Sequence, residues 1–119
     1  MKYTLFYLIS IICLTDINAQ DVKQAILYGR WKDSTLVASS IHNNTYNEVY
    51  SIYNERGEYA VIGSTAGTHI IDVTNPKDPK QIQFVKGKAT GTQIIHRDFK
   101  KYKNYLYAVC DEGQSSLQI

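Results

Sequence analysis

His96, Asp98 and Glu112 carry the side chains best suited to acid–base chemistry in this sequence. An imidazole and two carboxylates can pass protons to a substrate when they lie within hydrogen-bond reach of it. One interpretation is therefore a secreted hydrolase-like protein in which these groups gather at a polar central channel. The sequence has no Gly-x-Ser-x-Gly nucleophile elbow. We therefore favour a non-catalytic role, assign no catalytic residue, and treat the three as the candidates of the alternative.

Four carboxylates could supply the hard oxygen ligands that Ca²⁺ prefers. They are Asp72, Asp98, Asp111 and Glu112. No loop shows the alternating acidic spacing of a dedicated Ca²⁺ site, and turn capping is the simpler expectation for Asp72 and Asp111. His42, His69 and His96 lack the spacing of metal ligands. We predict no cofactor and no metal, with Ca²⁺ as the alternative.

The segment His96-Arg97-Asp98 resembles the catalytic loop of protein kinases, but the loop's Asn is out of place because position 103 is Lys. The sequence also lacks a Gly-rich phosphate loop and an Asp-Phe-Gly motif. The segment is better interpreted as a strand. Alternation along it places Arg97 and Phe99 on one face and Asp98 on the other, so Arg97 and Asp98 each need a separate partner.

The elements that must position these residues are short strands. Apolar and aromatic runs of five to seven residues alternate with turn signals, and no window shows the helical period of 3.6. The predicted strands are 25–31, 47–53, 58–63, 68–73, 80–85, 94–100, 105–110 and 116–119. Tight turns are predicted at 54–57 and 64–67, and a rigid corner at 74–79, which contains both prolines. The fold class is therefore all-β.

Two segments repeat at an offset of 48 residues. Tyr59-Ala60-Val61 matches Tyr107-Ala108-Val109, and Tyr53 lies one residue out of step with Tyr102. A period of 40–50 residues with three or four strands is typical of β-propeller blades. Chance similarity between two strands of a β-sandwich is the alternative. We predict an incomplete propeller of about two blades of antiparallel strands.

Three stretches resemble a known family. They are 27–31 with 44–49, 58–76, and 96–100 with 105–119, and the Ile-Ile-Asp-Val, Asn-Pro, Pro pattern at 70–79 is the most specific part. The sequence is similar to the N-terminal part of the choice-of-anchor B family of secreted bacterial β-propellers, built from LVIVD-type repeats. The resemblance implies a cell-surface module and no established catalytic residues. Because family members run to several hundred residues, we expect this chain to be a fragment whose second blade is truncated.

The domain organisation follows from the N-terminus. A basic start, an apolar run over 5–14 and the small residue Ala19 predict a secretory signal peptide over 1–19. Residues 20–46 are predicted to form an N-terminal strand and a polar loop, and residues 47–119 the two repeats. No membrane-spanning segment is expected after the signal is removed. Removing the signal also removes Cys13, so Cys110 is expected to be a buried, unreactive thiol.

Composition narrows the partners. The net charge of +2 arises from scattered residues, which argues against a nucleic-acid partner. Trp31 and Tyr28 are expected in the core of the first strand, with an exposed carbohydrate-binding platform as the alternative. The sequence therefore predicts a secreted or cell-surface module with a binding or structural role, whose partner is a protein or a glycan.

Overall fold

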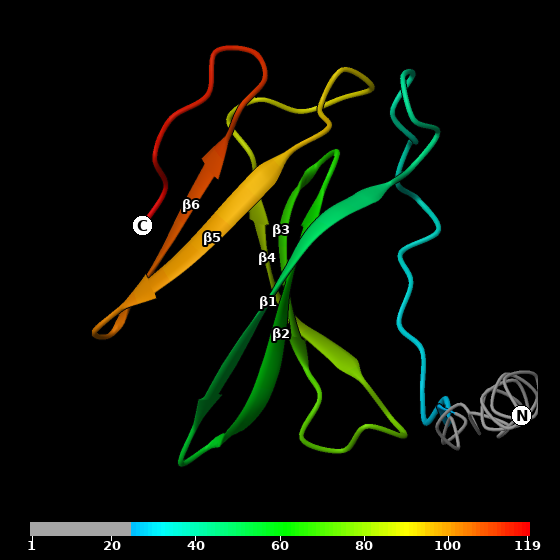
Figure 1. The fold of residues 1–119 in the computed structure, drawn as a ribbon, viewed down its shortest axis with the longest axis vertical. Coiled ribbons are helices and arrows are strands. Elements are labelled where there is room, and N and C mark those ends of the chain that lie inside the picture. The colour runs from blue at the N-terminus through cyan, green and yellow to red at the C-terminus, as the bar shows by residue number, and fades with distance from the viewer. Residues whose placement is uncertain (1–24) are drawn as a thin grey trace, which may run out of the picture.

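The computed structural model describes residues 25–119, which form an all-β fold of six antiparallel strands without a helix in that range. β1 (Tyr46–Asn54), β2 (Gly57–Ser64), β3 (Gly67–Asp72) and β4 (Lys80–Lys86) make a four-stranded meander. β5 (Arg97–Tyr102) and β6 (Tyr105–Cys110) make a separate two-stranded sheet. The two sheets form a V that opens toward β4 and β6 (Figure 1). The predicted signal peptide lies outside the described residues.

The core lies where the two sheets meet. Val61, Phe99 and Ala108 are buried against one another, and Tyr50, Ile52 and Leu106 pack around them. These side chains come from alternate positions of their strands, so the inward face of each strand is the apolar one. β5 packs on β1 and β2, whereas a groove separates β3 and β4 from β6. The smaller sheet therefore covers only half of the larger one.

The two hairpins have the same register. β1 and β2 pair from Asn54↔Gly57 to Val49↔Ile62, and β5 and β6 pair from Tyr102↔Tyr105 to Arg97↔Cys110. Adding 48 to each residue of the six β1–β2 pairs gives the six β5–β6 pairs. The structural repeat thus runs without a gap. It places Tyr102 opposite Asn54 rather than Tyr53, and the one-residue slip expected from the tyrosines is wrong.

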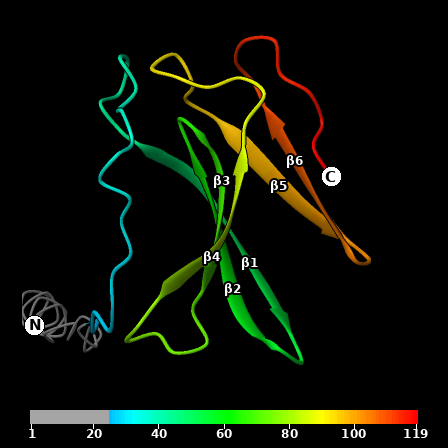
Figure 2. The same cartoon turned by 180° about the vertical axis from the view of Figure 1, so that it is seen from behind.

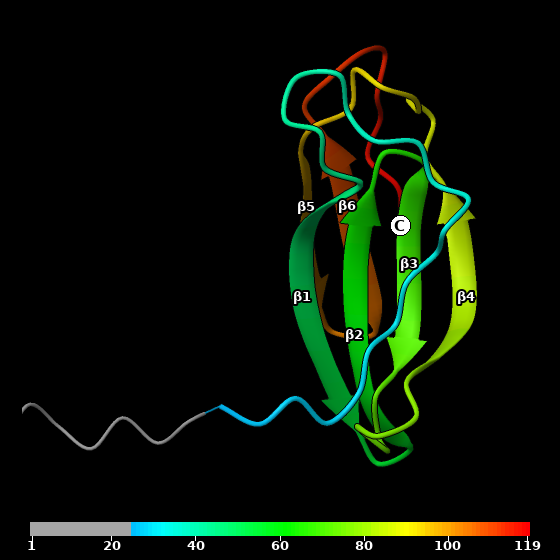
Figure 3. The same cartoon turned by 90° about the vertical axis from the view of Figure 1, so that its right-hand side faces the viewer.

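The predicted strand over 25–31 is not a strand. Residues 25–33 are extended but join no ladder, and Ile26, Leu27 and Tyr28 are exposed. The segment crosses the face of the larger sheet that lies opposite the smaller sheet, instead of adding to an edge (Figure 3). Apolar alternation alone does not distinguish a strand from an extended segment held by side chains, which explains the error.

This N-terminal strap, residues 29–38, is held at both ends. At one end Gly29 lies so close to the 76–79 corner that a Cβ atom would approach the carbonyl oxygen of Pro76 to 2.2 Å. At the other end Thr65 Oγ1 donates to the carbonyl of Val37 at 2.7 Å. Between them the Trp31 ring packs on His69, with ring centroids 5.1 Å apart. Trp31 is half-buried and Tyr28 is exposed, so the expectation that both belong to a core holds only for Trp31.

Two other strand boundaries differ from the prediction. β5 begins at Arg97 rather than at 94, because Glu112 takes the amide hydrogens of Ile95 and His96. Residues 116–119 form only an isolated bridge, between Gln118 and Ala108. The remaining predicted strands lie within two residues of β1–β4 and β6. The reverse view shows the C-terminal residues returning along β6 (Figure 2).

Candidate functional site

The sequence candidates meet at a polar groove of about 360 Å³ between the first residues of β1 and β5. This polar groove is lined by His42, Asn44, Tyr46, Asn47, Glu48, Ile95, His96, Arg97, Asp98 and Asp111. The strand β1 and the preceding loop provide one wall, and β5 with the 110–112 turn provides the other. Most of these side chains can both bind water and hydrogen-bond a ligand, so the groove suits a polar ligand.

His96 and Glu112 form the most ordered pair at this groove. His96 Nδ1 lies 2.8 Å from Glu112 Oε1, and Glu112 Oε2 accepts the amides of Ile95 at 3.1 Å and His96 at 3.0 Å. Partial burial opposes ionisation of Glu112. The two amide hydrogen bonds and the hydrogen bond and charge of the His96 ring outweigh that effect and hold the pKa of Glu112 at about 2. Glu112 is therefore a fixed anion that orients the His96 ring.

The remaining candidate, Asp98, lines the same groove but is not part of this pair. It is exposed on β5, and the hydrogen bonds of residues 25–119 include none from Asp98 to His96 or Glu112. Two of the three acid–base candidates are thus joined, and the third lies beside them. The arrangement provides an oriented imidazole next to an exposed carboxylate, which is the minimum for acid–base chemistry.

The four Ca²⁺ candidates divide into two places. Asp98 and Asp111 line the polar groove and Glu112 adjoins it, whereas Asp72 ends β3 beside Lys80. Asp72 Oδ1 accepts the amide of Thr74 at 2.9 Å, and hydrogen bonds from the hydroxyl and amide of Thr74 lower the pKa of Asp72. Asp72 is therefore a turn cap. Within residues 25–119 no three His, Cys, Asp or Glu side chains come together as a metal site requires.

Arg97 lies beneath the polar groove and joins the two sheets. Its side chain is buried, and its Nε and Nη2 atoms donate to the carbonyls of Ser64 and Ala89, both at 2.7 Å. Burial lowers the pKa of the guanidinium, an effect that Cys110 and Glu112 oppose. Alternation along the strand correctly separates Arg97 from Asp98, but the partners of Arg97 are main-chain carbonyls that no motif signals.

A second polar cluster, which the sequence analysis missed, is buried under the N-terminal strap. Ser64 Oγ lies 2.8 Å from His69 Nε2, and His69 Nδ1 lies 2.8 Å from Gln81 Oε1. The order of groups resembles a nucleophile, a base and an orienting residue. Ser64 and His69 are 0% and 1% exposed, however, and the Ser64 hydroxyl also accepts the amides of Ala66 and Gly67 at 3.2 Å. The cluster therefore stabilises the β2–β3 turn.

The only sequence signal for this cluster is the spacing of Ser64 and His69 across the predicted turn. Two residues that flank a short turn face each other on adjacent strands. Gln81 could not be found in this way, because its place opposite His69 depends on the 74–79 corner and on the bulge between β3 and β4.

Cys110 is buried and forms no disulfide with any described residue. None of the helices that a membrane span would require, long and apolar, is present in the described part of the chain. Comparison with protein-family models, with curated proteins and with solved structures gives no match.

Proposed function

We propose that the chain is a secreted or cell-surface β-propeller repeat module of the kind found in the choice-of-anchor B family, with a non-catalytic role in binding a protein or a glycan. One observation carries the proposal. The β1–β2 and β5–β6 hairpins have six ladder pairs in common after a shift of 48 residues. A shared register over a whole hairpin is difficult to obtain by chance, because a slip of one residue would turn every side chain to the opposite face.

The arrangement of strands agrees with two successive repeats. The first unit is a four-stranded antiparallel meander, as a propeller blade is. In the second unit the bridge between Ala108 and Gln118 occupies the place where β3 pairs with β2 in the first. The corresponding pair is Ala60↔Ile71, and the second unit differs from it by a single residue. Face-to-face packing of the two units through Val61, Phe99 and Ala108 is the contact that neighbouring blades would make.

The polar groove supports a binding role. It lies between the two units, and its Asn, Asp, Glu and His side chains can hydrogen-bond the hydroxyls of a glycan or the polar groups of a protein loop. Glu112 and Arg97 already use their hydrogen-bonding groups internally, so they hold the groove in shape. The free groups are those of Asn47, Asp98 and Asp111, which we expect to contact the ligand.

Two measurements test this proposal. Protease treatment of intact producing cells should release fragments of the chain, because the module is exposed to the exterior. A glycan and peptide array probed with the full chain should give binding that Asp98→Ala weakens. Lys88→Ala, at an exposed position outside the groove, is the matched control and should leave binding unchanged. A chain protected inside intact cells, or binding that Asp98→Ala leaves unaltered, would contradict the proposal.

The His96–Glu112 pair favours a second candidate function, a secreted hydrolase-like propeller. The oriented imidazole and the exposed Asp98 carboxylate would act as the general base and acid. Chromogenic esters and glycosides distinguish the two functions. Turnover that His96→Gln abolishes would establish hydrolysis, and turnover equal in the wild-type chain and the variant would exclude this site.

A further inference from the structure

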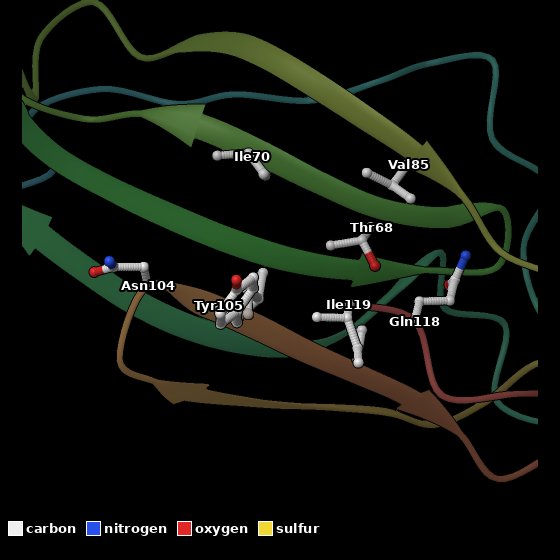
Figure 4. Close-up of a pocket in the computed structure, with 9 residues that line it drawn as sticks. Thr68, Ile70, Val85, Asn104, Tyr105, Gln118 and Ile119 are labelled. Carbon is white, nitrogen blue, oxygen red and sulfur yellow. The ribbon is translucent and has the colours of Figure 1, made fainter.

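An apolar groove lies beside β6, on the opposite side of the smaller sheet from β5. This β6 groove has a volume of about 230 Å³. Ile70 and Val85 of the larger sheet form one wall, and Leu106 and Ala108 form the other, with Ile119 between them (Figure 4). It lies in the open side of the V, where the two-stranded sheet leaves β3 and β4 uncovered (Figure 1).

One polar atom within the β6 groove lacks a partner. Thr68 is only 3% exposed, and its Oγ1 atom is the buried side-chain oxygen without a hydrogen bond among the described residues. Figure 4 shows the hydroxyl pointing toward the side of the groove where Gln118 and Ile119 lie. A buried hydroxyl without a partner is unfavourable, and a ligand that hydrogen-bonds it removes that cost.

The main chain of β6 also has free groups on this side. The amide and carbonyl of Ala108 exchange hydrogen bonds with Gln118 at 3.0 and 2.9 Å, so they point away from β5. In an antiparallel strand the direction of these groups alternates, and Leu106 therefore points its N–H and C=O into the groove as well. An extended chain that continues the Gln118 bridge would pair with Leu106.

Charge determines what the far end of such a chain carries. A strand antiparallel to β6 runs toward Tyr105, where the groove meets a second hollow lined by Arg56, Lys101 and Lys103. No carboxylate lines that hollow. Three cations without an acidic neighbour favour a carboxylate at the C-terminal end of the added strand.

We propose that the β6 groove binds an extended strand of a partner polypeptide that pairs antiparallel with β6, alternates apolar residues and ends in a carboxylate. β3 is the internal template, because it pairs with β2 in the same way and ends at Asp72. The inference rests on the repeat in the proposed function. A second copy fits poorly: its edge strand β4 would bring Lys86 to the basic hollow.

The test measures binding of a fluorescein-labelled peptide with the sequence of residues 65–73 to the full chain, by fluorescence anisotropy. We expect saturable binding and slower amide exchange at residues 104–108. Arg56→Glu with Lys103→Glu should weaken the affinity at least fivefold, and so should Asp72→Lys in the peptide. Thr68→Val, which keeps the shape and removes the hydroxyl, should weaken it about two- to tenfold. Lys88→Glu is the control and should have no effect.

Binding that is absent, or that neither charge reversal nor Thr68→Val changes, would overturn the proposal. A concentration-dependent dimer that the peptide does not displace would overturn it as well, because the groove would then be occupied by a second copy. Amide exchange of the free chain separates this result from failure of the proposed function. A protected β5–β6 hairpin without peptide binding refutes the partner strand alone, whereas an unprotected hairpin refutes the repeat.

Discussion

Glu112 illustrates how one carboxylate can shape a site without taking part in chemistry. It accepts two amides and the His96 ring, and these bonds end the irregular segment before β5. An anion engaged in this way contributes to folding as well as to the geometry of the polar groove. Its effect therefore appears in stability measurements as a function of pH.

Replacing Glu112 by Gln should flatten the acid side of the stability profile. The folded-state pKa of about 2 is below the ordinary value near 4.5, so the wild-type contribution is complete above pH 4.5 and disappears as the pH falls toward 2. We expect a loss of about 1–3 kcal/mol at pH 7, reduced from the full linkage value because solvent reaches the carboxylate. Urea denaturation from pH 2 to 7 measures it. Equal slopes for both proteins would contradict the expectation.

Arg97 should be sensitive even to a conservative change. Lys cannot donate to Ser64 and Ala89 from two separate nitrogens, so Arg97→Lys leaves a buried carbonyl without its partner. We expect a loss of about 1.5–3 kcal/mol in the free energy of unfolding. Chemical denaturation is the measurement, with Lys100→Ala on the exposed face of β5 as the control. A variant as stable as the control would show that the bridge between the sheets is dispensable.

At the scale of elements, the sequence predicts hairpins well and extended segments poorly. The hairpin strands have local turn signals, such as Gly57 and the Pro-rich corner, and their partners follow within a few residues. The strap over residues 29–38 has the same apolar alternation, but its position depends on the Trp31–His69 contact and on the 76–79 corner, which lie far along the chain.

The candidate site shows the same limit. His96, Asp98, Asp111 and Glu112 are identifiable by residue type, and the sequence alternation separates Asp98 from Arg97. The pairing of His96 with Glu112 is not identifiable, because it depends on the turn after β6 returning to the start of β5. Distant contacts of this kind come from topology rather than from any local pattern.

Trp31 and Tyr28 offer a matched test of the strap. Trp31 packs on His69 and Tyr46, whereas Tyr28 is 60% exposed. Trp31→Ala should lower the free energy of unfolding by about 2–3 kcal/mol, less than a fully buried Trp would cost, and should expose the strap to proteases. Tyr28→Ala should change stability by less than about 0.5 kcal/mol. Limited proteolysis and thermal melting compare the two. Equal effects would place Tyr28 in the core after all.

At the scale of the whole molecule, the uncovered half of the larger sheet is the dominant feature. Ile82, Phe84 and Val85 on β4 are partly exposed, as are Leu117 and Ile119 near β6. β4 also presents an unpaired edge along which another chain can add. A fold with a large apolar face and free edges is expected to be marginally stable and to self-associate.

Residues 20–119, expressed without the predicted signal peptide, should therefore elute as more than one species in size-exclusion chromatography. Ile82→Lys, which places a charge on the exposed edge, should shift the distribution toward the monomer. A single monomer peak with a cooperative melting transition above about 60 °C, the upper part of the usual mesophile range, would refute marginal stability.

The shared register of the two hairpins has a consequence for how the chain folds. Each hairpin closes through a two-residue loop, and such contacts form within microseconds. Arg97 and Ser64, by contrast, are 33 residues apart, so their contact requires closure of a much longer loop. The hairpins should form first and dock afterwards. Arg97→Lys should therefore accelerate unfolding more than it slows folding, a difference that stopped-flow kinetics can resolve.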